Sequence, residues 1–119
     1  MYYRWIVIEN SLNDKSILDM YQKLSQTDFE KNNPMYKIRV PEEEVLKFSA
    51  DLKNKIIHPY YSHFYHEDPR KGNLIVVFAN KRFLASKDTY KLAMDYGVSH
   101  EVSVEAMQIE PTDVSEERW

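Results

Sequence analysis

The chain has 119 residues, of which 43% are hydrophobic and 29% charged, and its formal net charge is −3. This length suits one domain and this composition is that of a globular protein, which argues against global disorder and against two ordinary domains. The sequence contains no cysteine, which excludes disulfides, thiolate metal sites and cysteine nucleophiles. Its two glycines, Gly72 and Gly97, stand alone, so neither a P-loop nor a dinucleotide-binding fingerprint is present.

We expect no targeting signal at the start of the chain. The aliphatic run Ile6–Ile8 is too short for the core of a signal peptide. No stretch approaches the roughly 18 apolar residues that a membrane helix needs. We therefore expect a cytoplasmic protein without a membrane partner.

The first part of the chain predicts a strand, a helix and a second strand. Residues 2–9 alternate with apolar side chains on both sides, as in a well-covered strand. Ser16 and Asp19 fit a capping box, which predicts a helix over residues 16–26. The apolar positions of that helix are Ile17, Met20, Tyr21 and Leu24. A polar loop over 27–34 and a strand over 35–40 follow.

A second helix is expected over residues 42–56. Pro41 suits a first helical position, and the acidic run Glu42–Glu44 suits the positive end of the helix dipole. The apolar stripe of this helix is Val45, Phe48, Leu52 and Ile56. Pro59 prevents the helix from continuing.

The second half predicts a three-stranded meander and a third helix. The strands are expected over the aromatic segment 60–65, the apolar run 74–79 and residues 82–86. A helix capped by Asp88 is expected to end at Gly97.

Beyond that helix, residues 102–106 alternate like a short last strand, although Ser99 could equally open a helical turn. Residues 111–119 are acidic and have the composition of a loose tail. The element order predicts one α+β domain over residues 1–110, with about three helices on an antiparallel or mixed sheet of about five strands.

The segment from Tyr61 to Phe83 carries a recognisable motif. Tyr61-Ser62-His63-Phe64-Tyr65 precedes Leu74-Ile75-Val76-Val77-Phe78, and Arg82-Phe83 follows. In this motif the chain resembles a family of small, uncharacterised archaeal and bacterial proteins, in which an aromatic-x-His-Phe-aromatic strand is followed by an L-I-V-V-F strand. The resemblance extends from about Met35 to Gly97. It implies a small single module and assigns no catalytic or binding role to any residue.

Three histidines, His58, His63 and His66, fall within nine residues and raise the question of a metal site. On a strand, His63 points away from the other two, and His58 and His66 lie roughly 26 Å apart if the strand is straight. Glu67 or Asp68 next to His66 is too common a pattern to indicate a metal. We therefore expect neither a metal nor a cofactor.

His63 also suits general acid–base catalysis, because an imidazole titrates near neutral pH. Such a role needs an orienting carboxylate, for which Glu9 and Asp95 are the candidates. This is the alternative hypothesis: a small lyase, isomerase or hydrolase that uses His63. The simpler interpretation is a partly buried histidine that hydrogen-bonds a neighbouring strand.

Tyr61, His63 and Tyr65 share one side of their strand and would form an aromatic wall. With Arg39 or Arg4 nearby, this wall would suit a small anionic or aromatic ligand. It would equally suit the seam of a homo-oligomer, where tyrosine and arginine are enriched, or ordinary core packing.

The basic doublets Arg70-Lys71 and Lys81-Arg82 lie at opposite ends of a predicted strand, roughly 20 Å apart, and do not form one patch. We expect no nucleic-acid partner. The leading hypothesis is a non-catalytic, homo-oligomeric module that binds a small molecule at the aromatic strand.

Overall fold

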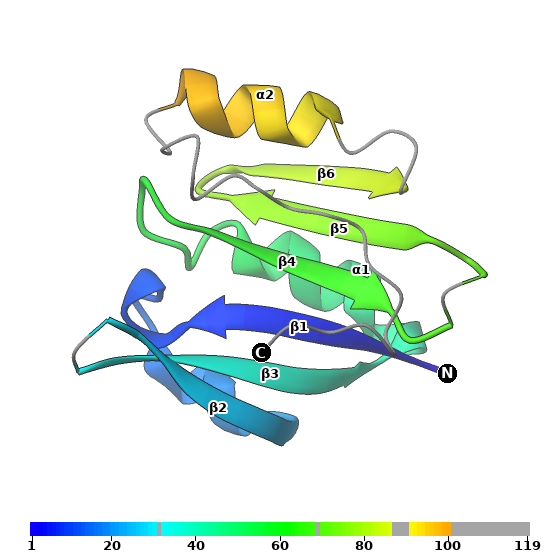
Figure 1. Ribbon diagram of the computed structural model, residues 1–119, viewed down its shortest axis with the longest axis horizontal. Coiled ribbons are helices and arrows are strands. Elements are labelled where there is room, and N and C mark those ends of the chain that lie inside the picture. Colours follow the sequence, from blue (N-terminus) through cyan, green and yellow to red (C-terminus); the bar gives the residue numbers. More distant parts are fainter. Residues whose placement is uncertain (31, 69, 87–90, 101–119) are drawn as a thin grey trace.

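Six antiparallel strands form one sheet in the computed structural model, which describes residues 1–30, 32–68, 70–86 and 91–100. The strands are β1 (Tyr2–Ile8), β2 (Gln22–Glu30), β3 (Asn33–Pro41), β4 (Tyr61–His66), β5 (Asn73–Phe78) and β6 (Lys81–Ser86). Their order across the sheet is β2-β3-β1-β4-β5-β6 (Figure 1). β1 is therefore central, flanked by β3 and β4, which are joined through the first helix.

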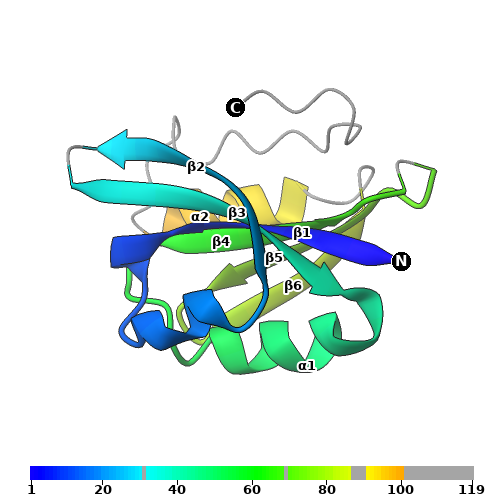
Figure 2. The same cartoon turned by 90° about the horizontal axis from the view of Figure 1, so that it is seen from below.

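Two α-helices lie on opposite sides of this sheet. α1 (Glu42–Leu52) lies on one side and α2 (Lys91–Ser99) on the other, as Figure 2 shows. The acidic first turn predicted for α1 is present and follows Pro41, the last residue of β3. α1 is shorter than expected: Ile56 is buried beyond its end, in an isolated bridge with Leu12. The α+β class therefore holds, with six strands and two α-helices in the described ranges in place of about five and three.

The helix predicted over 16–26 is wrong. A short 3₁₀ helix, Lys15–Asp19, is capped by Asp14, whose carboxylate accepts the N–H of Ser16. The chain then becomes β2. The apolar positions do not form one buried stripe, because Ile17 is buried whereas Met20 and Leu24 are exposed.

Two further boundaries differ from the predictions, and three predictions are not tested. The loop expected over 27–34 belongs largely to the β2–β3 hairpin, whose Asn32 has a φ of 62°, a conformation that asparagine tolerates. Gly97 does not end the last helix but lies buried within α2. Asp88, the strand predicted over 102–106 and the tail over 111–119 lie outside the described residues.

The main core lies between α1 and the sheet. Trp5 is fully buried there, with Phe48 of α1 edge-on at 4.9 Å and Phe64 of β4 stacked at 5.7 Å between ring centroids. Burial of each large side chain stabilises the fold by roughly 1.5–3 kcal/mol. A second cluster joins β5 to α2 on the opposite face. Its buried members are Leu74, Val76, Phe78 and Ala93. β4 contributes side chains to both clusters, because Phe64 lies in the main core whereas Tyr61 and Tyr65 pack against the second cluster.

Among the residues that the structure describes, no helix has the length and apolar character needed to cross a membrane.

Candidate functional site

The strand predicted over 60–65 is present as β4, one residue later at each end, and its side chains alternate between the two faces of the sheet. Ser62, Phe64 and His66 are buried. Tyr61 and Tyr65 are partly buried and pack on the cluster formed with α2. The prediction that Tyr61, His63 and Tyr65 share one face is therefore confirmed.

These three side chains form a row of rings along β4. The His63 ring lies 6.2 Å from Tyr61 and 6.2 Å from Tyr65, between ring centroids, with interplanar angles of 26° and 24°. Phe78 of β5 extends the row at one end, 5.8 Å from Tyr61. We call Tyr61, His63 and Tyr65 the aromatic row. The planes of its successive rings are nearly parallel.

Burial shifts the pKa of two side chains of the aromatic row. It lowers the pKa of His63 to about 4, because the imidazolium is poorly solvated there. Burial also raises the pKa of Tyr61 to about 12. At neutral pH the imidazole of His63 is therefore uncharged, with one ring nitrogen as a hydrogen-bond donor and the other as an acceptor.

Two arginines lie beside the aromatic row. The register of the sheet places Arg4 of β1 opposite Tyr65 on one side and opposite Arg39 of β3 on the other. Directly paired residues share a face of the sheet, so Arg39 reaches the same face as the row, one strand further away. Lys37 of β3 also lies on this face, where it is paired with Ile6 and buried.

Glu67, the residue after β4, holds both arginines. Its carboxylate accepts hydrogen bonds from Arg39 Nε at 2.8 Å and Nη2 at 2.7 Å, and from Arg4 Nε at 3.2 Å. Although burial acts to raise the pKa of Glu67, these hydrogen bonds and charges hold it below its usual value. The Arg39 guanidinium also lies 4.1 Å from the ring centre of Tyr2. We call Arg4, Arg39 and Glu67 the arginine cluster, which carries one net positive charge.

The sequence alone associated Glu67 only with a metal at His66. It could not show the arginine cluster, because Glu67 is 63 positions from Arg4 and 28 from Arg39. Strand alternation could have placed Glu67 on the correct face, because residue 67 lies on the same face of β4 as residue 65.

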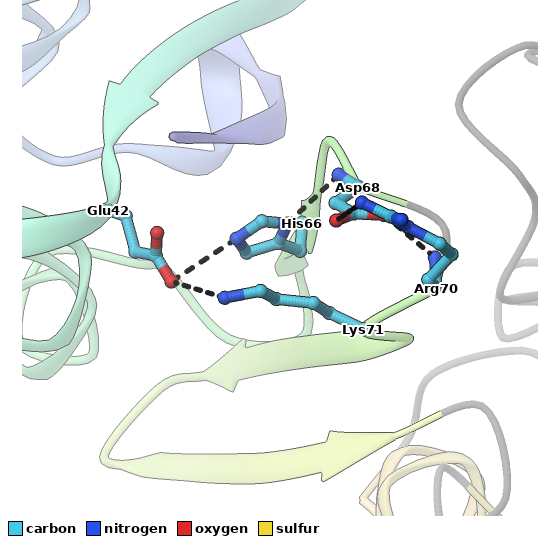
Figure 3. A network of polar contacts seen from close by, with 5 residues as sticks. All are labelled: Glu42, His66, Asp68, Arg70 and Lys71. Carbon is cyan, nitrogen blue, oxygen red and sulfur yellow. Dashed lines mark hydrogen bonds and ion pairs between the residues drawn. The ribbon is translucent and has the colours of Figure 1, made fainter.

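His66 lies on the opposite face, in a separate polar group near the start of α1 (Figure 3). Its Nδ1 accepts the backbone N–H of Asp68 at 2.9 Å, and its Nε2 lies 3.2 Å from Glu42 Oε1. Lys71 Nζ approaches the same carboxylate oxygen at 3.7 Å. The Tyr3 ring is edge-on to the imidazole, at 4.9 Å between ring centroids.

The other residues singled out in the sequence have separate contacts. Glu9 accepts a hydrogen bond from the Tyr36 hydroxyl at 3.5 Å, and Asp95 is exposed on α2. Within the described ranges, no group of three or more histidine, aspartate or glutamate residues is arranged to hold a metal ion.

The two basic doublets are also engaged within the chain. Arg70 forms two side-chain hydrogen bonds with Asp68, both at 3.0 Å. Arg82 donates to the carbonyl oxygen of Leu46 at 2.6 Å and to the hydroxyl of Ser49 at 3.0 Å. The arginine of each doublet therefore has hydrogen-bond partners within the chain.

Comparisons of the chain with protein-family models, with curated proteins and with solved structures found no match. The family resemblance of residues 35–97 therefore stays a prediction.

Proposed function

We propose that this chain is a small cytoplasmic module that binds a small aromatic anion without catalysis. The site is the face of the sheet that carries the aromatic row and the arginine cluster. The observation that supports this most strongly is their adjacency: Tyr65, the last ring of the row, is directly paired with Arg4. A ligand with a flat ring and an acidic group would engage both features.

Each part of the site has a chemical role in this proposal. The rings of Tyr61 and Tyr65 supply flat apolar contact area with little side-chain entropy to lose. The planar guanidinium of Arg39 matches a carboxylate, phosphate or sulfonate group through paired N–H donors. Glu67 already occupies those donors, so the ligand's anionic group would share or replace that carboxylate.

The alternative, a small lyase, isomerase or hydrolase that uses His63, has less support. With a pKa of about 4, His63 is a neutral imidazole at pH 7, so it carries no imidazolium proton to donate as a general acid. It would also be a weak base, since proton transfer is most effective when the pKa lies near the working pH. A neutral His63 suits hydrogen bonding to a ligand better than proton transfer.

Titration calorimetry of the full chain with three probes tests binding. The probes are benzenesulfonate, sulfate and benzyl alcohol, which separate the contributions of the ring and the anion. We expect saturable 1:1 binding of benzenesulfonate, with the other two weaker by about tenfold, a difference of about 1.4 kcal/mol. Arg39→Gln should weaken benzenesulfonate binding by a similar factor.

The matched control is Arg70→Gln, which removes the same charge from an exposed arginine that pairs with Asp68, two residues away. Equal affinity in the two arginine variants, or no saturable binding by the wild-type chain, would refute the proposed site.

We further propose that the module is a homo-oligomer. Three leucines on three elements are largely exposed: Leu46 of α1 (58%), Leu84 of β6 (60%) and Leu92 of α2 (69%). Leu84 lies on β6, the last strand in the order of the sheet, and an edge strand with exposed apolar side chains can pair with a strand of a second copy. Sedimentation velocity at micromolar concentration should show a species larger than the 14.3 kDa chain. A single monomeric boundary would contradict this proposal.

A further inference from the structure

The two edges of the sheet differ in regularity. β2 forms one edge and pairs with β3 through two register shifts, one between Lys23 and Ser25 and one between Asp28 and Glu30. β6 forms the other edge (Figure 1) and pairs with β5 along its whole length without a shift. Irregularities in an edge strand hinder pairing with another chain, whereas a regular edge strand permits it. β6 is therefore the edge that suits a further strand.

The pairing of the sheet determines which backbone groups of β6 face outward. Glu67 donates its N–H to the carbonyl oxygen of Tyr2, so the odd-numbered residues of β4 bond β1 and the even-numbered ones bond β5. The same alternation makes the even-numbered residues of β5 bond the odd-numbered residues of β6. The N–H and C=O groups of Arg82 and Leu84 therefore point away from β5. Within the described ranges, no strand pairs with this side of β6.

The side chains of Arg82 and Leu84 lie on the α1 side of the sheet. Leu84 is paired with Ile75, a member of the main core, yet Leu84 is 60% exposed. Arg82 bends back to its own chain, where it donates to the carbonyl oxygen of Leu46 at 2.6 Å. Leu46 is itself 58% exposed. This edge of the molecule therefore combines outward backbone groups with exposed apolar side chains, and its arginine is held within the chain.

Charge and available backbone groups select the register in which a second β6 can pair with the first about a twofold axis. With Arg82 on the axis, the two arginines would be directly opposite, which is unfavourable for like charges. With Leu84 or Ala85 on the axis, the pairing would need the backbone of Ser86, which already takes part in another interaction. With Phe83 on the axis, Arg82 of each copy meets Leu84 of the other, and no like charges within β6 are opposite.

We propose that a second copy of this chain pairs with the outer edge of β6, antiparallel and with Phe83 on the twofold axis. This inference rests on the homo-oligomer proposed above and names the surface through which the copies meet. Arg82 and Leu84 of each copy form hydrogen-bonded pairs with Leu84 and Arg82 of the other. Because the same residues contribute from both copies, the contact closes at a dimer.

The side chains at this contact match on both faces of the joined sheet. Directly opposite residues share a face, so Leu84 packs on the alkyl part of the partner's Arg82, close to the partner's Leu46. On the other face the two Phe83 rings meet at the axis, where each also packs against Tyr96 of its own α2 at 5.2 Å between ring centroids. The α1 helices of both copies therefore lie on one side of the joined sheet and the α2 helices on the other.

Single cysteines test the register, because the chain contains no cysteine of its own. Residues opposite each other in a non-hydrogen-bonded pair have Cα atoms about 4.5 Å apart, a distance that a disulfide spans. Phe83→Cys should therefore form a disulfide-linked dimer under mild oxidation. In Leu84→Cys the two cysteines are diagonal neighbours, about 7–8 Å apart, and should link poorly. A Leu84→Cys variant that links as fast as Phe83→Cys would contradict this register.

Sedimentation equilibrium of the full chain tests the surface. Leu84→Lys removes an exposed apolar side chain and places a positive charge opposite the partner's Arg82. The wild type should be a dimer of the 14.3 kDa chain. The variant should raise the dissociation constant of that dimer by at least about tenfold. The matched control is Leu24→Lys, the same change at an exposed leucine of the other edge strand, β2, and it should leave the dimer intact.

The outcomes separate this surface from the proposals above. A wild-type assembly that Leu84→Lys leaves intact would overturn the β6 contact while the homo-oligomer stands. A monomeric wild-type chain would overturn both, and neither result bears on the binding of benzenesulfonate.

Amide hydrogen exchange of the wild-type chain gives a readout that needs no variant. The N–H groups of Arg82 and Leu84 should exchange slowly at concentrations where the dimer forms and fast on dilution. Fast exchange of both amides in the dimer would refute the pairing of β6, whether or not Phe83→Cys folds.

Discussion

The chemistry of single residues in this protein depends on which face of β4 they occupy. Phe64 is fully buried against Trp5, whereas its neighbour His63 lies in the aromatic row on the other face. Ser62, also on the Trp5 side, accepts the indole N–H of Trp5 at 2.6 Å. Adjacent positions in the sequence therefore belong to different layers, with different solvation and partners.

The depressed pKa of His63 predicts a loss of stability in acid. The folded chain binds a proton at His63 with a pKa of about 4, whereas the ordinary value is 6.5. Below pH 6.5 the unfolded chain therefore takes up the proton first, and stability falls until pH 4. The contribution is about 3 kcal/mol in total, at about 1.4 kcal/mol per pH unit.

Urea unfolding of the wild-type chain and of His63→Gln between pH 7 and pH 4 measures this contribution. The variant should lose less stability than the wild type over this range. Parallel curves for the two chains would show that His63 does not titrate with a depressed pKa.

The charged partners of these residues could not be predicted from the sequence, although their faces could. Strand parity alone places Tyr61, His63 and Tyr65 together, and the structure agrees. The pairing of Glu67 with Arg4 depends on β1 lying next to β4, and no local pattern specifies that neighbour. Strand order is a property of the whole fold.

At the scale of elements, segments with one dominant local signal were predicted best. The acidic run after Pro41 begins α1, and the apolar run predicted as a strand over 74–79 corresponds to β5, Asn73–Phe78. The segment 16–26 failed because apolar residues at a spacing of three or four also fit a 3₁₀ turn followed by a strand. There, pairing of β2 with β3 outweighs local helix propensity.

The two apolar residues at the ends of that segment should therefore differ in energetic importance. Ile17 is buried in the main core, so Ile17→Ala should destabilise the fold by about 2–5 kcal/mol. Leu24 is exposed on β2, and Leu24→Ala should cost less than about 1 kcal/mol. A helix over 16–26 with one buried stripe would instead give similar costs. Chemical denaturation of the two variants decides between these outcomes.

At the scale of the whole molecule, the sheet separates a structural layer from the proposed binding layer. α1 lies on one side of the sheet and α2 on the other (Figure 2). The main core is on the α1 side, and the aromatic row and the arginine cluster are on the α2 side. On the second face, Arg4 and Arg39 bind the carboxylate of Glu67, and Lys37 lies two residues before Arg39 on β3. The guanidinium of Arg39 is the group that the proposal assigns to the acidic group of the ligand.

A chemical-shift map of the full chain titrated with benzenesulfonate tests this account most directly. Saturable shifts should concentrate on Tyr61, His63 and Tyr65 and on the side-chain N–H groups of Arg4 and Arg39, with the core around Trp5 unaffected. Shifts that do not saturate, or that gather on the α1 side of the sheet instead, would contradict the assignment of this face as a ligand-binding site.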